Sequence, residues 1–308
     1  MARQTQNYLR ELFSRKGIAP RHRFGQNFLI DLNLHEVIVK AAEVGPGDVI
    51  LEVGPGAGAL TTLMAERGAA VVAVDIDPMM VQLTTEATLG MPNVRVIHAD
   101  ALESKNRLDP FVLDQIRAGL AVEGEHRFKL TANLPYNVAT PIITNLLVHP
   151  DPVLRPERLV VTIQLELAER MTAAPQSENY SSLSVLIQAL TDVEVVRVLP
   201  PSVFWPRPKV DSAVIKITPN AEKKAAIGDL PWFHSVVRRV FLHRRKHLRG
   251  VLHTMSEGKL SKVETDALLG DLGLDGSLRA ETMNVEEWIS LADALRPILD
   301  PVADTDGA

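Results

Sequence analysis

The chain has 308 residues, no cysteine and a formal charge of −5 at pH 7. This length accommodates one large domain and a smaller one, and without cysteine the chain can form neither disulfides nor thiolate metal sites. No apolar run is long enough to span a membrane and residues 1–16 lack the apolar core of a secretory signal, so we expect a cytoplasmic protein.

The charge is unevenly distributed along the chain. Residues 257–308 contain 12 acidic and 4 basic side chains, a net charge of −8, which leaves +3 for residues 1–256. Basic residues gather at 10–23 and again at 238–249. Because local fields decide where phosphate groups bind, the acidic total does not exclude a nucleic-acid ligand.

The first predicted element is a basic helix that ends before residues 17–20. Leu9, Leu12 and Phe13 fall on one helical face, surrounded by arginine and lysine. The sequence RHRFGQNFLID at 21–31 then predicts a shaped loop before a second helix over residues 32–43. The local pattern of 21–31 alone favours a polar connector with two buried phenylalanines.

From residue 49 the chain alternates strands and helices. The apolar run VILEV ends in GPGAG at 54–58, and a helix follows over residues 60–67. Such a turn exposes backbone amides to a ligand. Asp75 stands at the end of the next strand, roughly twenty residues on, where a carboxylate can bind both ribose hydroxyls. The glycine spacing, with Gly54 and Gly56 preceded by Glu52, favours S-adenosylmethionine over NAD; a purely structural glycine turn is the alternative.

A helix over residues 78–89 and a strand over 94–98 follow, and Asp100 stands just past that strand. An acid at this point can accept a hydrogen bond from the adenine amine of the cofactor, although a capping role is equally common. The polar stretch 103–127 is interpreted as a surface excursion with a short helix at 110–119, and we assign it no chemistry.

The next strand ends in Asn-Leu-Pro-Tyr at 133–136. The Asn133 Oδ1 atom and the Leu134 carbonyl can accept the two hydrogens of an aromatic amine, while the Tyr136 ring covers the base. This alignment turns the amine lone pair toward a sulfonium methyl group, and no strong base is needed because the nitrogen becomes acidic as it gains charge. An ordinary turn with Pro135 as a strand stop is the alternative.

A helix over 141–149, a strand over 159–164 and a helix with Glu166 and Glu169 come next. Because helix carboxylates are usually solvated, we assign no metal site. Strands at 193–198 and 213–217 are expected to close the sheet as a hairpin-like pair around PPSVFWPRPK at 200–209. Phe204 in this proline-stiffened loop can stack on the target base opposite Tyr136; burial of Phe204 and Trp205 in the core is the alternative.

After residue 219 the composition becomes helical, which indicates a domain boundary. We expect a methyltransferase domain with the basic helix over 1–219, a helical RNA-binding domain over 220–300 and a disordered tail at 301–308. The sequence HRRKHLR at 243–249 supplies four candidate phosphate ligands: Arg244, Arg245, Lys246 and Arg249.

The motifs, taken in this order, resemble the ribosomal RNA adenine dimethyltransferases, in particular the bacterial small-subunit enzymes of the KsgA type. The resemblance covers residues 21–296. It is carried by FGQNFL at 24–29, EVGPGAGALT at 52–61, DID at 75–77, DAL at 100–102, NLPY at 133–136, PPSVFWPRPKVDSAV at 200–214, RRKHLR at 244–249 and RAETM at 279–283.

This resemblance implies an α/β fold: a Rossmann-like seven-stranded S-adenosylmethionine methyltransferase sheet with a small C-terminal all-α domain. It matches Tyr136 and Phe204 to aromatics that clamp the base. The implied substrate is two adjacent adenines in a small-subunit rRNA hairpin loop, each methylated twice during 30S biogenesis. The implied cofactor contacts are Asn27, Leu29, Gly54, Asp75, Asp100 and Asn133.

Some positions depart from the family pattern. Leu165, Ser181 and His247 stand where the family usually has Lys, Gly and Thr, and the excursion before Asn133 is longer than typical. These positions lie outside the cofactor motifs, so the departures concern RNA contacts and loop geometry more than the reaction.

Other functions are compatible with parts of the pattern. The enzyme reading predicts a monomer that acts on rRNA in 30S precursor particles, without DNA or membrane partners. A ribosome-assembly factor that acts by occupancy and a resistance-type large-subunit rRNA methyltransferase are the alternatives. A DNA adenine methyltransferase is expected to carry Asp- or Asn-Pro-Pro-Tyr, and an NAD dehydrogenase needs a different glycine spacing.

Overall fold

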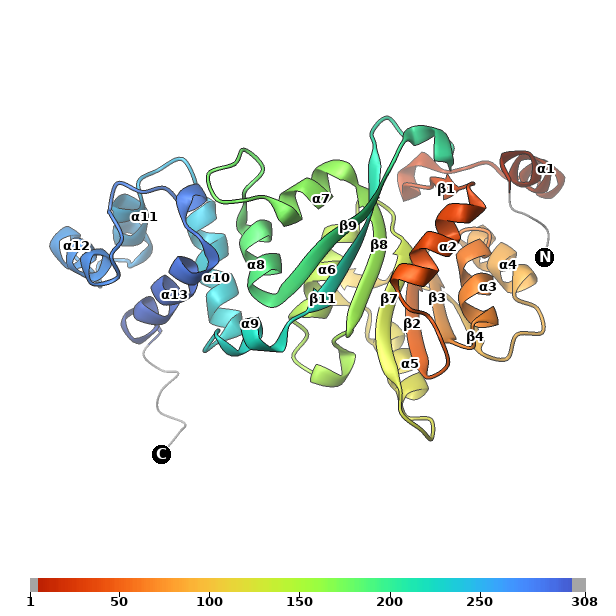
Figure 1. The fold of residues 1–308 in the computed structure, drawn as a ribbon, viewed down its shortest axis with the longest axis horizontal. Helices are drawn as coiled ribbons and strands as arrows, with labels where there is room; N and C mark the ends of the chain where they lie inside the picture. The colour runs from red at the N-terminus through yellow and green to blue at the C-terminus, as the bar shows by residue number, and fades with distance from the viewer. Residues whose placement is uncertain (1–4, 301–308) are drawn as a thin grey trace. The chain divides into compact units, whose positions relative to one another are not determined.

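The computed structural model describes residues 5–300 (Figure 1), and the tail expected at 301–308 lies outside the described residues. The chain forms two compact units. The first, which we call the sheet unit, contains residues 5–168 and Val193–Pro219; the second, the helical unit, contains Glu169–Asp192 and residues 220–300. The sequence analysis kept 169–192 with the N-terminal domain, whereas its contacts group this stretch with the C-terminal helices.

The sheet unit contains a seven-stranded sheet in the order β4-β3-β2-β7-β8-β11-β9. The first five strands in this order are parallel, and β11 runs antiparallel to β8. This sheet confirms the expected Rossmann-like α/β fold. The strands are β2 (Asp48–Val53), β3 (Ala70–Asp75), β4 (Val94–His98), β7 (Arg127–Asn133), β8 (Arg158–Gln164), β9 (Thr191–Leu199) and β11 (Ser212–Pro219).

The strand order reverses between β2 and β7. From β2 the chain builds β3 and β4 toward one edge, and it then returns to place β7 on the other side of β2. In open α/β sheets the loops at the carboxyl ends of such strands separate and leave a crevice for ligands. The topology therefore places the candidate site at the ends of β2 and β7, where the glycine turn and Asn133 lie.

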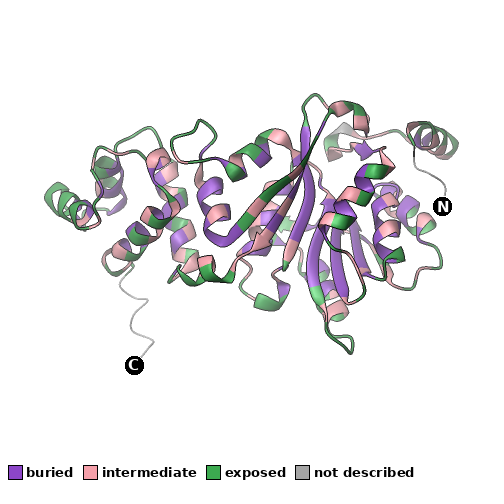
Figure 2. Ribbon diagram, viewed as in Figure 1, coloured by how far each residue is buried: buried purple, intermediate pink, exposed green. Residues whose placement is uncertain are grey.

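Helices cover both faces of the sheet. α2 (Leu32–Ala41) and α3 (Ala59–Glu66) lie in front of it in the view of Figure 1, and α5 (Pro110–Leu120) and α6 (Ala139–Leu147) lie behind. The central strands are buried along most of their length (Figure 2). The front core joins Ile38, Leu60, Met64, Ile50, Val71 and Val160.

The short helix predicted at 110–119 is confirmed as α5, but the stretch 103–127 is more than the surface excursion that the sequence suggested. It holds a small antiparallel pair, β5 (Leu102–Ser104) with β6 (Arg107–Leu108), and then α5, which buries Val112, Leu113 and Ile116. The apolar side chains of α5 recur at helical spacing, so the helix covers the sheet while its charged residues face solvent. The high content of charged residues in this segment therefore led to the wrong prediction that it only covers the surface.

The predicted basic helix is α1 (Gln6–Lys16), which Thr5 caps and Gly17 ends in the left-handed conformation. Its buried Leu9 and Phe13 pack on a second antiparallel pair, β1 (Phe28–Leu29) with β10 (Phe204–Trp205). The Phe13 ring meets Phe28 and Trp205 edge-on, at centroid distances of 5.3 and 5.2 Å. Segments distant in sequence thus support residues 24–29 from outside. α4 (Pro78–Ala87) follows β3.

The helical unit packs around α10 (Leu230–Phe241) and α13 (Val285–Leu299). Trp288 is fully buried and stacks on Phe241 at 5.3 Å. The Tyr180 hydroxyl donates to the Met283 carbonyl at 2.8 Å, which attaches the stretch 169–192 to the C-terminal helices. The other helices of this unit are α8 (Ser182–Leu190), α9 (Ala221–Ala225), α11 (Leu248–Met255) and α12 (Lys262–Asp271); α7 (Leu165–Thr172) connects the two units in sequence.

Four short 3-10 helices complete the fold: His22–Phe24, Pro152–Leu154, Pro201–Val203 and Ala280–Thr282. Within residues 5–300, no helix combines the length and the apolar composition that crossing a membrane requires.

Candidate functional site

A cavity of about 300 Å³ opens at the carboxyl ends of β2, β3 and β7. Residues 23–29, which we call the N-terminal wall, form one side of it. The other sides come from the glycine turn after β2, from the ends of β3 and β4, and from residues 133–138 after β7. The cavity brings together nine of the predicted site residues: Asn27, Leu29, Gly54, Gly56, Asp75, Asp100, Asn133, Leu134 and Tyr136.

The glycine turn is shaped by close neighbours as well as by its backbone. Gly54 and Gly56 have φ angles of 75° and 61°, which side chains rarely adopt. A Cβ atom on Gly56 would lie 2.9 Å from the Phe28 ring, and one on Gly54 would lie 3.1 Å from Pro135. Only glycine therefore lets the turn approach both the N-terminal wall and the segment after β7.

Three acids line the cavity: Glu52 and Asp75 within the last two residues of β2 and β3, and Asp100 two residues after β4. Glu52 is 1% exposed and accepts a hydrogen bond from the Thr61 hydroxyl at 2.5 Å, and burial raises its pKa to about 8. Burial likewise raises the pKa of Asp75 to about 6, against the effect of the hydrogen bond that its Oδ1 accepts from the Asp77 amide at 2.8 Å. Asp100 accepts from the Leu102 amide at 2.9 Å. A positively charged ligand would favour the ionised form of the two buried carboxyl groups, those of Glu52 and Asp75.

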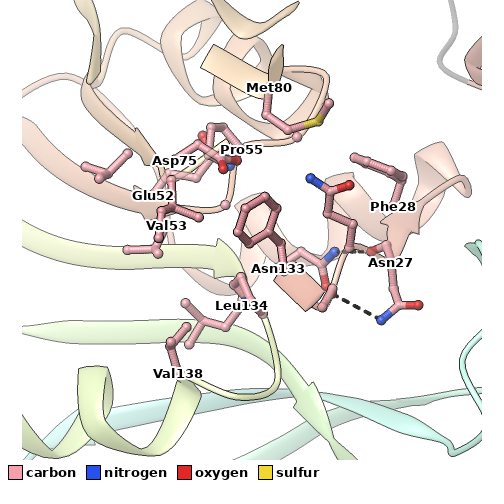
Figure 3. A pocket seen from close by; sticks show the side chains of 18 of the residues that line it. Asn27, Phe28, Glu52, Val53, Pro55, Asp75, Met80, Asn133, Leu134 and Val138 are labelled. Atoms are coloured by element: carbon pink, nitrogen blue, oxygen red, sulfur yellow. Dashed lines mark hydrogen bonds between the residues drawn. The ribbon is translucent and has the colours of Figure 1, made fainter. Parts of the chain in front are cut away.

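The orientation of the Asn133 amide is fixed by a main-chain partner. Its Nδ2 atom donates to the Asn27 carbonyl at 2.9 Å (Figure 3). Because a carbonyl only accepts, Nδ2 must face Asn27, and Oδ1 remains available as an acceptor. The Leu134 amide donates to the Thr162 carbonyl of β8 at 3.2 Å, and its own carbonyl accepts no hydrogen bond from residues 5–300. Asn133 and Leu134 both line the cavity, and their roles as acceptors for an aromatic amine stay a prediction.

Tyr136 is held by a residue that sequence reasoning missed. Its hydroxyl forms a hydrogen bond of 2.7 Å with Ser212 Oγ, and Ser212 is fully buried at the start of β11. Burial raises the pKa of the Tyr136 phenol, so the ring stays protonated and neutral at physiological pH. No local signal identifies this pair, because the two residues meet only after β11 has joined the sheet.

Phe204 does not line the cavity. It is 3% exposed, and its strand β10 pairs with β1 so that Phe204 lies opposite Leu29. This pairing directs the ring into the front core, and Trp205 packs on Phe13 and Phe28. The structure therefore places both aromatics as the core alternative describes, and the expected position of Phe204 opposite Tyr136 is not what it shows.

His35 is a second cavity residue to which the sequence analysis gave no role. It lies on α2, is 6% exposed, and its Nδ1 atom has no hydrogen-bond partner among the described residues. Burial lowers its pKa to about 4, so the imidazole is neutral at pH 7. The available signal was a lone histidine on an otherwise apolar helix face, a pattern that buried structural histidines share.

The four cations proposed to bind RNA lie on the helical unit. Arg244, Arg245 and Lys246 are exposed in the turn between α10 and α11, and none forms an ion pair within the described part of the chain. Arg249, in the first turn of α11, pairs with Asp266 at 2.6 Å. Three of the four charges are therefore free to meet phosphate groups.

The residues of the cavity suit a nucleoside with a positively charged extension. Asp75 offers a carboxylate at the end of β3, where ribose hydroxyls bind in such folds, and the glycine turn presents bare backbone where a Cβ would collide. Asn133 Oδ1 supplies an acceptor without a partner in the described residues. S-adenosylmethionine has both the nucleoside and the cationic centre that this donor and acceptor set fits.

Comparisons with known proteins agree with this reading. A family model described as ribosomal RNA adenine dimethylase matches residues 18–295. The chain is 40% identical over 288 residues to the ribosomal RNA small subunit methyltransferase A of Moorella thermoacetica, covering 92% of this chain and 96% of that one. It is 38% identical to the protein of the same name from Geobacillus thermodenitrificans, covering 94% and 95%.

Two solved structures show the same fold. A dimethyladenosine transferase from Plasmodium falciparum superposes with a TM-score of 0.70 at 24% identity, covering 86% of this chain and 96% of that one. The 23S rRNA methyltransferase ErmE superposes with a TM-score of 0.61 at 28% identity, covering 87% and 99%.

Proposed function

Because this chain belongs to the ribosomal RNA adenine dimethylase family, we propose that it methylates the exocyclic amines of two adjacent adenines in a hairpin loop of small-subunit rRNA, each amine twice. The observation that supports the chemistry is the fixed Asn133 amide: its Nδ2 is held by the Asn27 carbonyl, and Asn133 and Leu134, consecutive residues after β7, both line the cavity. Small-subunit rRNA as the substrate rests on the names of the curated relatives.

S-adenosylmethionine supplies an electrophilic methyl group on a sulfonium centre. We assign its ribose to Asp75, its adenine amine to Asp100, and its close backbone contacts to Gly54 and Gly56. The ionised Asp75 binds the ribose hydroxyls, and the cavity acids offset the positive charge. Asn27, Leu29 and Asn133 complete the proposed cofactor contacts.

The chain's own contribution to transfer is alignment. Asn133 Oδ1 and the Leu134 carbonyl accept the two amine hydrogens, so the nitrogen lone pair is freed from the ring and points at the methyl carbon. As the N–C bond forms and the C–S bond breaks, the nitrogen becomes cationic, and both acceptors stabilise it. The nitrogen then loses a proton to solvent, and no side-chain base is required.

Tyr136 covers the base. Its hydroxyl is held by Ser212 and the residue lines the same cavity as Asn133 and Leu134. In the proposal its ring stacks on a base that has left its helix, a contact that typically contributes about 1–3 kcal/mol. We propose that Phe204 acts from the core, where it supports Leu29 in the N-terminal wall, because its ring has almost no exposed surface.

Recognition of the RNA beyond the target base is assigned to the charged turn of the helical unit. Arg244, Arg245 and Lys246 bind phosphate groups without reading the sequence, and Arg249 joins them when phosphate displaces Asp266. We propose 30S precursor particles as the partner, the cytoplasm as the location and a monomer as the working form.

The decisive experiment offers three substrates to the purified protein with labelled S-adenosylmethionine: undermethylated 30S particles, 50S particles and DNA. Nucleoside analysis then identifies the product. Dimethyladenosine in the 30S sample alone supports the proposal. Label in the 50S sample alone would favour the activity named for ErmE, with which the chain shares 28% identity. Binding to 30S particles without any label would favour an assembly factor that acts by occupancy.

A further inference from the structure

Asp77 is a buried acid two residues beyond the proposed ribose ligand Asp75. It is 1% exposed, and its Oδ1 atom caps α4 by accepting from the Met79 amide at 3.1 Å. The same carboxylate accepts from Arg21 Nη1 at 3.2 Å and from Gln26 Nε2 at 2.9 Å. A helix cap needs only the first of these bonds, so the other two require a separate explanation.

Of the two partners beyond the cap, Gln26 belongs to the N-terminal wall and Arg21 lies two residues before it. Gln26 uses both ends of its amide, because Nε2 donates to Asp77 while Oε1 accepts from the Arg21 amide at 2.8 Å. Its orientation is therefore fixed. The next residue is Asn27, whose carbonyl orients the Asn133 amide (Figure 3). Fixing Gln26 thus fixes the acceptor on which the Asn133 orientation depends.

Asp77 is also bonded to the cofactor side of the cavity. Its main-chain amide donates to Asp75 Oδ1 at 2.8 Å. A continuous set of hydrogen bonds therefore runs from Asp75 through Asp77 and Gln26 to the wall, and from the Asn27 carbonyl to Asn133. Each step in this set is either a hydrogen bond or the peptide bond that joins Gln26 to Asn27.

We propose that Asp77 is a positioning residue that couples cofactor binding at Asp75 to alignment of the target amine at Asn133, by holding the N-terminal wall through Gln26 and Arg21. The inference rests on the proposed function, since it assumes the roles of Asp75 and Asn133. It assigns Asp77 no contact with substrate or cofactor.

A pair of substitutions separates this role from helix capping. Asp77→Asn retains an oxygen for the Met79 amide, but turns an amide N–H group toward Gln26 Nε2, so two donors face each other. Gln26→Glu instead places two carboxylates together. Combining Asp77→Asn with Gln26→Glu restores one donor and one acceptor, and the new carboxylate still accepts from the Arg21 amide. A role limited to capping predicts no rescue.

The test measures two quantities for each variant: the Kd of S-adenosylhomocysteine by titration calorimetry, and the single-turnover rate on undermethylated 30S particles. Loss of a hydrogen bond to a charged group corresponds to about a tenfold change or more. We expect each single variant to weaken binding and to slow transfer about tenfold, and the double variant to return both to within about threefold of wild type. Gln26→Ala places neither two donors nor two carboxylates against each other, and it is expected to show the same losses of affinity and rate.

Lys16→Ala is the matched control. It breaks the 2.6 Å ion pair between α1 and Glu86 of α4 but leaves the N-terminal wall intact, so both quantities should stay at the wild-type value. Single variants with wild-type binding and rate, or a double variant no better than the singles, would overturn the coupling. If the wild type itself does not methylate 30S particles, the proposed function fails, a result that is distinguishable because the binding measurements do not depend on RNA.

Discussion

Replacing Asn133 by alanine tests the alignment chemistry most directly. The substitution removes one of the two acceptors in the cavity and leaves the Leu134 carbonyl in place. Removing one preorganised hydrogen-bonding group from an active site typically lowers the rate about 10²–10³-fold, which is about 2.7–4 kcal/mol. The variant also loses the 2.9 Å bond to the Asn27 carbonyl, and this costs about 1 kcal/mol in the free energy of unfolding.

The rate and the affinity should respond differently to this change. Single-turnover methylation of undermethylated 30S particles, with saturating cofactor, is expected to fall at least about 100-fold. The Kd of S-adenosylhomocysteine should change less than about tenfold, because Asp75, Asp100 and the glycine turn remain.

The control for Asn133→Ala is Asn145→Ala on α6. Asn145 likewise donates its Nδ2 to a main-chain carbonyl, that of Lys105 at 3.2 Å, but it does not line the cavity. Its removal should leave the rate unchanged. Transfer by Asn133→Ala at the wild-type rate would refute the assigned role.

Three further outcomes are expected. Burial raises the pKa of Asp75 to about 6, and the ribose hydroxyls bind the carboxylate form. The Kd of S-adenosylhomocysteine should therefore be constant above pH 6 and rise about tenfold per pH unit below it. Calorimetry that gives the same Kd from pH 7 to pH 5 would contradict this. Lys129→Met removes the buried partner that lies 2.8 Å from Asp48, while Arg127 remains 3.0 Å from the same carboxylate. The free energy of unfolding in urea titrations should therefore fall by about 1.5–3 kcal/mol, the usual loss of a hydrogen bond to a charged group, and an unchanged value would be inconsistent. Cofactor affinity should not change, because Asp48 begins β2, at the opposite end of the strand from the cavity. The 2.7 Å hydrogen bond between Tyr136 and Ser212 is lost in either Ser212→Ala or Tyr136→Phe. Each substitution should weaken RNA binding by about 1 kcal/mol, and the two losses should not add in a double-mutant cycle. Full additivity would argue against a functional bond.

The parts of the site that the sequence predicted are those that local spacing determines. A glycine turn after a strand and acids at the ends of the next two strands meet at one edge of any parallel sheet, so Gly54, Asp75 and Asp100 could be placed together without coordinates. Asn133 was placed by the same rule. The structure adds what spacing does not contain, which is the bond from Asn27 that selects the orientation of the Asn133 amide.

The parts that were missed depend on pairing between distant segments. Phe204 is buried because β10 pairs with β1, and nothing near Phe204 in the sequence encodes that partner. The hydrogen bond from Ser212 to Tyr136 forms only once β11 lies beside β8. The stretch 169–192 belongs to the helical unit through contacts such as Tyr180 with Met283, which composition does not reveal.

The division of the helical unit into two stretches of sequence has a consequence for synthesis on the ribosome. α8 is translated before the helices α10 and α13 that pack on it, and 109 residues separate its end at Leu190 from the end of α13 at Leu299. At about 5–20 residues per second, that interval lasts roughly 5–20 s. For that time α8 lacks the cover of α10 and α13, so the nascent polypeptide should be a chaperone client until its last helix emerges.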